Sequence, residues 1–75
     1  MDEEITPEVK HTLIQQEIMM WRGSRYQLQL RHRVHKALGT KDILEQIEKE
    51  LEMCEKALDV LEIARAELRN GEMTS

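Results

Sequence analysis

The chain has 75 residues and a formal net charge of −4, so it forms at most one domain, and a domain of this size buries only about 60% of its unfolded surface. A single cysteine excludes an intramolecular disulfide, and no cysteine or histidine cluster has the spacing of a zinc site. Oligomerisation is therefore the remaining way to supplement a small core.

The composition favours long helices and gives no sign of strands. Phenylalanine is absent, glycine occurs three times and proline once, while leucine, glutamate, lysine and glutamine are common helix formers. No apolar run reaches the length of a signal sequence or a membrane span, and the first residues are acidic. We therefore expect an all-α protein in the cytoplasm.

The first helix is predicted over 7–38, after an acidic disordered tail at 1–5. Thr6 can cap the helix with its hydroxyl, and Pro7 suits the first helical position because its missing N–H would have no partner there. Gly39 can take the left-handed conformation that closes a helix. The pair Gly23-Ser24 is the one weak point inside this segment, and we expect the helix to continue through it.

The second helix is predicted over about 41–70, capped by Thr40 and ending before Gly71, with a flexible tail at 71–75. Because so short a link joins two helices of similar length, we expect an antiparallel hairpin, with 6–70 as the single domain. The second helix carries a heptad seam of a coiled coil, interrupted only at Arg65. The seam residues are Leu44, Ile47, Leu51, Cys54, Leu58, Leu61 and Leu68.

Further apolar residues widen this seam beyond what one neighbouring helix covers. They are Ile43, Met53, Ala57, Val60 and Ala64.

The first helix has two apolar sides. We expect one side to cover the second helix, and it comprises Ile5, Val9, Leu13, Met20, Leu30, Val34 and Leu38, together with Gln16, Gly23 and Gln27. The other side would be exposed in a lone hairpin, and a contiguous apolar patch with the only tryptophan is typical of an interface. The sequence thus predicts a homodimeric four-helix bundle. Its predicted interface is Ile14, Ile18, Trp21, Leu28, Met53, Ala57, Val60 and Ala64.

A basic segment from Arg22 to Lys41 contains no acidic residue. One interpretation is an exposed stripe that follows a nucleic-acid backbone, formed by Arg22, Arg25, Arg33 and Lys36. The other interpretation is charge complementarity within the hairpin, because this segment would lie beside the acidic residues of 42–57.

Candidates for chemistry are few. His32 and His35 lie one turn apart, and Glu8 precedes His11 by three residues, but the glutamates that a dimetal bundle needs on the facing helix are missing. Cys54 occupies a core position, where cysteine acts as a small hydrophobe. We therefore expect no catalytic residue, no metal site and no cofactor. Gln16 and Gln27 either fix the register or oligomeric state, or mark a face that is partly open near Gly23.

The sequence favours a non-enzymatic module for protein interaction or assembly, which acts as a homo-oligomer and as an adaptor or regulator. Another helical protein is the expected partner if the partner is not a second copy. Binding of RNA or DNA by the basic stripe is the alternative.

Overall fold

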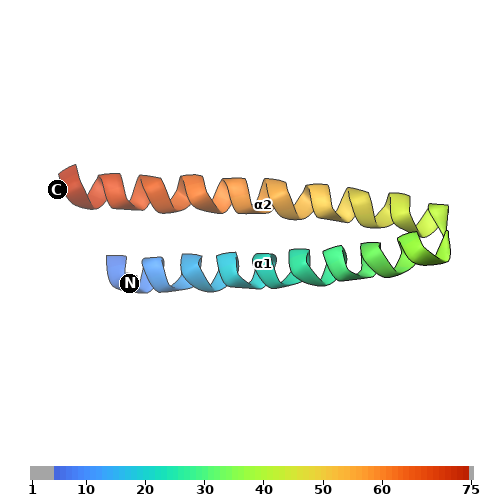
Figure 1. Ribbon diagram of the computed structural model, residues 1–75. Coiled ribbons are helices and arrows are strands. Elements are labelled where there is room, and N and C mark those ends of the chain that lie inside the picture. Colours follow the sequence, from blue (N-terminus) through green and yellow to red (C-terminus); the bar gives the residue numbers. More distant parts are fainter. Residues whose placement is uncertain (1–4, 75) are drawn as a thin grey trace.

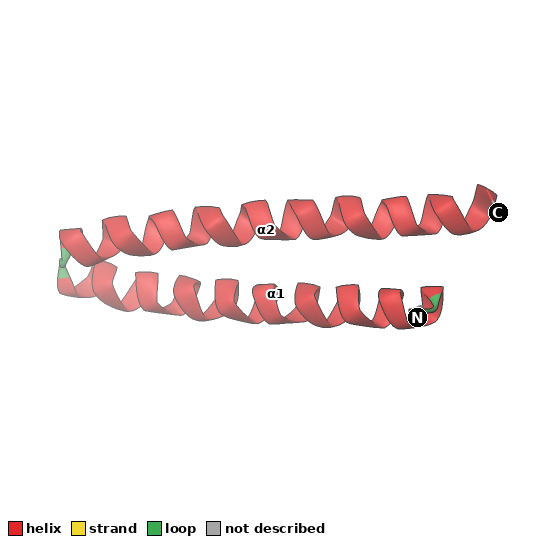
Figure 2. Cartoon of the chain, turned by 180° about the vertical axis from the view of Figure 1, so that it is seen from behind, coloured by secondary structure: helices red, strands yellow, loops and turns green. Residues whose placement is uncertain are grey.

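The computed structural model describes residues 5–74, with side chains described as far as Gly71. The described chain consists of two helices and contains no strand: α1 spans Pro7–Leu38 and α2 spans Lys41–Thr74. The helices run antiparallel and pack side by side (Figure 1). The same arrangement seen from behind shows one corner at the left and both chain ends at the right (Figure 2). The predicted all-α hairpin is confirmed.

Both predicted ends of α1 are confirmed by their capping groups. The backbone N–H of Val9 donates to the hydroxyl oxygen of Thr6 over 3.3 Å, and Pro7 is the first helical residue. At the other end Gly39 has φ 76° and ψ 24°, and its N–H donates to the carbonyl of His35 over 2.9 Å. This left-handed conformation favours glycine because a Cβ would meet the neighbouring carbonyl.

The corner between the helices is closed by hydrogen bonds around Thr40. Its N–H donates to the carbonyl of His35 over 3.2 Å, and its hydroxyl lies 2.9 Å from Nδ1 of the same histidine. The carbonyl of Thr40 then accepts from the N–H of Leu44 over 3.1 Å, which begins α2. A corner this short forces the two helices to run antiparallel.

The end of α2 differs from the prediction, because the helix continues past Asn70 and through Gly71 to Thr74. Gly39 is the one described glycine with positive φ, so Gly71 has not adopted the closing conformation. Glycine in a helix costs only about 1 kcal/mol relative to alanine, which does not by itself end a helix. The predicted tail at 71–75 is thus helical as far as Thr74, and most of the predicted tail at 1–5 lies outside the described residues.

The heptad seam of α2 packs against α1 as predicted, since each of its apolar members is buried or half-buried. Ile47 and Cys54 form the core cluster with Leu28 of α1, and Trp21 and Leu51 pack against it. Neither helix, over the described residues, has an apolar stretch long enough to cross a membrane.

The prediction of which side of α1 faces α2 is wrong, because the buried and the exposed sides are exchanged. Ile18 is fully buried and Leu28 is 8% exposed in the single chain, although both were expected on the free side. Leu13 and Val34, which were expected to cover α2, are 46% and 55% exposed. The residues that face α2 recur at alternating steps of three and four, and we call them the inner seam. They are His11, Ile14, Ile18, Trp21, Arg25, Leu28, His32 and His35.

Polar residues within the inner seam explain the error. A count of apolar residues disfavours a face that carries three histidines and an arginine. These side chains can nevertheless pack with their carbon atoms inside and their polar ends reaching outward. His32 does so with its Nε2 placed 3.1 Å from a carboxylate oxygen of Glu48 on α2, and His35 does so at the corner with Thr40.

Candidate interaction surface

A row of exposed residues runs along α1 on the side away from α2. Alternating steps of four and three residues separate its members, so the row is a second helical stripe opposite the inner seam. We call it the outer stripe, and it comprises Val9, Leu13, Gln16, Met20, Gly23, Gln27, Leu30 and Val34. Every member is exposed in the hairpin. The hairpin therefore has an apolar helix face that its own second helix does not cover.

Other large apolar side chains extend this surface. Met19 and Tyr26 border the outer stripe and are 64% and 61% exposed. Ile5 and Leu38 lie beyond its two ends and are exposed as well. Isolated exposed hydrophobic residues are normal in monomeric proteins, but a contiguous patch along a whole helix is typical of a binding surface.

Gly23 lies near the middle of the outer stripe and has no role in the packing of the hairpin. A Cβ built at this position would meet nothing within 4 Å, and the backbone φ is not positive. Alanine here would stabilise the isolated helix by about 1 kcal/mol. The hairpin alone gives no reason for a glycine at this position.

The edge of α2 that was predicted to join the interface is also accessible. Met53 and Val60 are 62% and 63% exposed, whereas Ala57 and Ala64 are half-buried. Open grooves lie between the helices, and two of them expose parts of the core. One is lined by Trp21, Ser24, Leu28, Glu50, Met53 and Cys54, and the other by Lys10, Leu13, Ile14, Ala64, Glu67 and Leu68.

The predicted interface residues of α1 have a different environment from the one expected. Ile14, Ile18, Trp21 and Leu28 lie in the inner seam and already contact α2 or are covered by it. Their burial within one chain removes the reason for assigning them to a second copy. The exposed apolar residues of α1 are instead those of the outer stripe.

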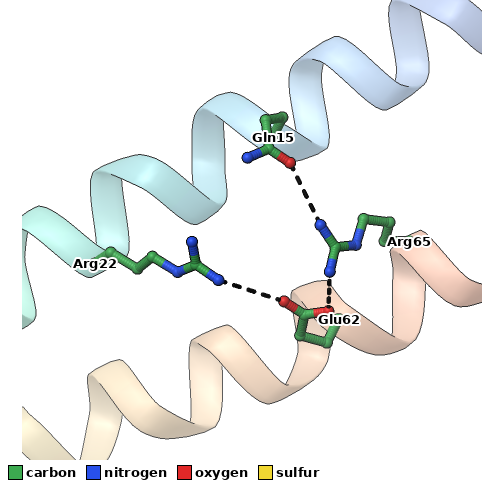
Figure 3. A network of polar contacts seen from close by, with 4 residues as sticks. All are labelled: Gln15, Arg22, Glu62 and Arg65. Carbon is green, nitrogen blue, oxygen red and sulfur yellow. Dashed lines mark hydrogen bonds and ion pairs between the residues drawn. The ribbon is translucent and has the colours of Figure 1, made fainter.

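Arg65, which interrupts the heptad of α2, belongs to a polar network (Figure 3). Its guanidinium lies 2.6 Å from one carboxylate oxygen of Glu62 and donates to the amide oxygen of Gln15 over 3.5 Å. The other oxygen of Glu62 lies 4.0 Å from the guanidinium of Arg22 on α1. The network thus connects the two helices along one flank of the hairpin. Such exposed pairs contribute at most about 1 kcal/mol each.

The basic stripe does not form one continuous open face. Arg25 is half-buried in the inner seam, and Arg22 lies beside Glu62, whereas Arg33 and Lys36 are exposed. The contact of His32 with Glu48 lies within the acidic segment 42–57 that the charge-complementarity interpretation names, whereas Arg22 contacts Glu62 beyond that segment.

The histidines and the cysteine are placed for packing. His32 and His35 contact Glu48 and Thr40, and His11 is half-buried in the inner seam. Over the described part of the chain, no three histidine, cysteine, aspartate or glutamate side chains lie close enough together to hold a metal ion. Cys54 is free and 3% exposed, so its thiol lies in the core as predicted.

Comparison with known proteins finds no relative: no family model matches the sequence, and no curated protein and no solved structure matches it.

Proposed function

We propose that this protein is a non-enzymatic assembly module, a coiled-coil-like helical hairpin that works as a homo-oligomer. The smallest such assembly is a homodimer that brings four helices together. The observation that supports this proposal is the outer stripe, an apolar face that extends along α1 and remains exposed in the single chain. In the described residues the hairpin leaves more large apolar side chains exposed than it buries.

Two physical arguments connect this surface to association. A short hairpin with few fully buried side chains is marginally stable, and binding of a second chain to the folded form adds stability by mass action. Removal of a contiguous apolar face from water is also the main driving force for association. Grooves that are shallow and open offer no water-free cleft for catalysis.

The proposal is tested by sedimentation equilibrium together with circular dichroism on the wild type and two variants. Leu30→Glu places a charge on the outer stripe, and Gln29→Glu places the same charge on the adjacent exposed position. We expect dimers for the wild type and for Gln29→Glu at tens of micromolar, and a helical monomer for Leu30→Glu. A wild-type chain that stays monomeric and fully helical up to about 100 µM would contradict the proposal.

The nucleic-acid alternative has less support than the assembly proposal. Of the four residues predicted for that contact, Arg22 and Arg25 are engaged at or near the contact between the helices. Phosphate binding needs cations that are free to replace the counterions of the nucleic acid.

A further inference from the structure

The outer stripe of α1 has the same chemical order in both directions. Its residues are, in sequence, Val9, Leu13, Gln16, Met20, Gly23, Gln27, Leu30 and Val34. The outermost pair are valines, the next pair leucines and the next pair glutamines, with methionine and glycine at the centre. The spacing of four and three residues is also symmetric. In an antiparallel pair of identical helices each residue faces its mirrored position in the other copy, so this order places like side chains opposite each other.

We propose that the partner of α1 is α1 of a second copy, running antiparallel, with Val9 of each copy opposite Val34 of the other. This inference rests on the proposed function and specifies the partner and its orientation. In this register every facing pair has the same sum of residue numbers, which is the geometric condition for an antiparallel pair. The layers are Val9 with Val34, Leu13 with Leu30, Gln16 with Gln27, and Met20 with Gly23.

The central layer gives Gly23 a purpose that the hairpin alone does not. A Cβ at Gly23 would meet nothing within 4 Å inside one chain, so the space above it is open to a second molecule. In the proposed register this space faces the exposed side chain of Met20 from the other copy. A large side chain then packs over a small one, as close packing of two helices requires. The two-fold axis passes halfway between these two residues, so the layer occurs twice.

The glutamine layer fixes the register. The amide of Gln16 can both donate to and accept from the amide of Gln27 in the other copy. A shift of one heptad would place Gln16 against Val34 or Met20 and leave its amide without a partner. Polar residues within an otherwise apolar seam set register and orientation in this way.

The edges of the outer stripe are complementary in the same register. Coiled-coil geometry places Met19 near Tyr26 of the other copy on one edge, and both are exposed in the hairpin. On the other edge it places Glu17 near Arg31. Neither of these two forms an ion pair with any residue that the structure describes.

The charge distribution of α1 favours the antiparallel orientation over the parallel one. The part of α1 from Arg22 onward carries cations and no acidic residue. The cations are Arg22, Arg25, Arg31, Arg33 and Lys36. A parallel pair would place these two basic halves beside each other. An antiparallel pair places each basic half beside the half that carries Glu8 and Glu17, and it also opposes the helix dipoles favourably.

Disulfide cross-linking distinguishes the orientations. Leu13→Cys and Leu30→Cys are prepared as separate chains, one with a tag that changes its size, and are oxidised alone and mixed. In the antiparallel register the two positions face each other. The same residue in the two chains lies about 25 Å apart along the helix axis. A disulfide needs Cα atoms within about 7 Å. The wild type, whose Cys54 is buried, is the control for background oxidation.

We expect a cross-linked dimer with one chain of each kind from the mixture, and none from either variant alone. Cross-linking of Leu13→Cys to itself would overturn the antiparallel orientation while leaving the assembly proposal intact. A dimer by sedimentation that forms no cross-link in the mixture would overturn the use of the outer stripe. A wild-type monomer by sedimentation would overturn the assembly proposal and this inference together.

A swap of the central layer provides a second test that does not depend on oxidation. Gly23→Met raises helix propensity but fills the space opposite Met20, so we expect its dimer dissociation constant to rise at least about tenfold. The double variant Met20→Gly with Gly23→Met keeps the composition and reverses the layer, and it should recover most of the affinity. A Gly23→Met dimer as tight as the wild type, or a double variant weaker than Gly23→Met, would contradict the proposed layer.

Discussion

The two faces of α1 show that the more apolar face of a helix is not always the buried one. The inner seam contains three histidines and Arg25 among its eight positions, yet it faces α2. The outer stripe contains only Gln16, Gly23 and Gln27 as exceptions to an apolar row, yet it is exposed. Two of the polar residues of the inner seam have polar partners, His32 in Glu48 of α2 and His35 in Thr40 at the corner. An apolar face left without an intramolecular partner is then free for another chain.

Truncation of the most buried residue of the inner seam should have the largest effect. Ile18 is fully buried, and an isoleucine to alanine change in a core lowers the free energy of unfolding by about 2–5 kcal/mol. Ile18→Ala should therefore lose most of its helicity or unfold at a much lower urea concentration, as measured by circular dichroism at low protein concentration. Met19→Ala, next in sequence and exposed, is the control and should stay within about 0.5 kcal/mol of the wild type. Equal effects of the two variants would contradict the assignment of the inner seam.

The features of this molecule that could be predicted from the sequence are those that depend on residues close together in the chain. Thr6, Pro7 and Gly39 mark the ends of α1 because capping groups act within one turn. The heptad seam of α2 could likewise be predicted, because its apolar residues lie on one side of the helix. The end of α2 could not be predicted, because Gly71 tolerates the helical conformation as well as the left-handed conformation that closes a helix.

The rotation of α1 about its axis could not be predicted from apolar counts, because it depends on contacts between residues far apart in the chain. The pairing of His32 with Glu48 spans 16 positions and connects the two helices. One signal in the sequence was available: the spacing of three and four is unbroken from His11 to His35 when histidine and arginine are accepted as seam residues. The symmetric order of the outer stripe was the other available signal.

A truncation in the outer stripe should have a smaller effect that depends on protein concentration. Alanine forms helices better than valine, so Val34→Ala should leave the isolated hairpin unchanged or slightly more stable at low concentration. At concentrations where two copies associate, the lost side chain should lower the midpoint of thermal unfolding relative to the wild type, by an amount that corresponds to about 1 kcal/mol. Thermal unfolding at several concentrations measures both regimes. An effect of the same size at every concentration would mean that Val34 contributes inside the hairpin instead.

The polar network around Glu62 should contribute least to the free energy of unfolding. Glu62 contacts Arg22 at 4.0 Å and Arg65 at 2.6 Å, but the side chains are partly exposed and water screens their charges. Glu62→Gln should therefore lower the free energy of unfolding by less than about 1 kcal/mol, and the difference should shrink as salt rises. Glu55→Gln, one heptad earlier on α2, removes a charge without an ion pair in the described residues and is the matched control. A loss well above that of the control at high salt would show that the network, and not the inner seam alone, holds α1 in its observed rotation.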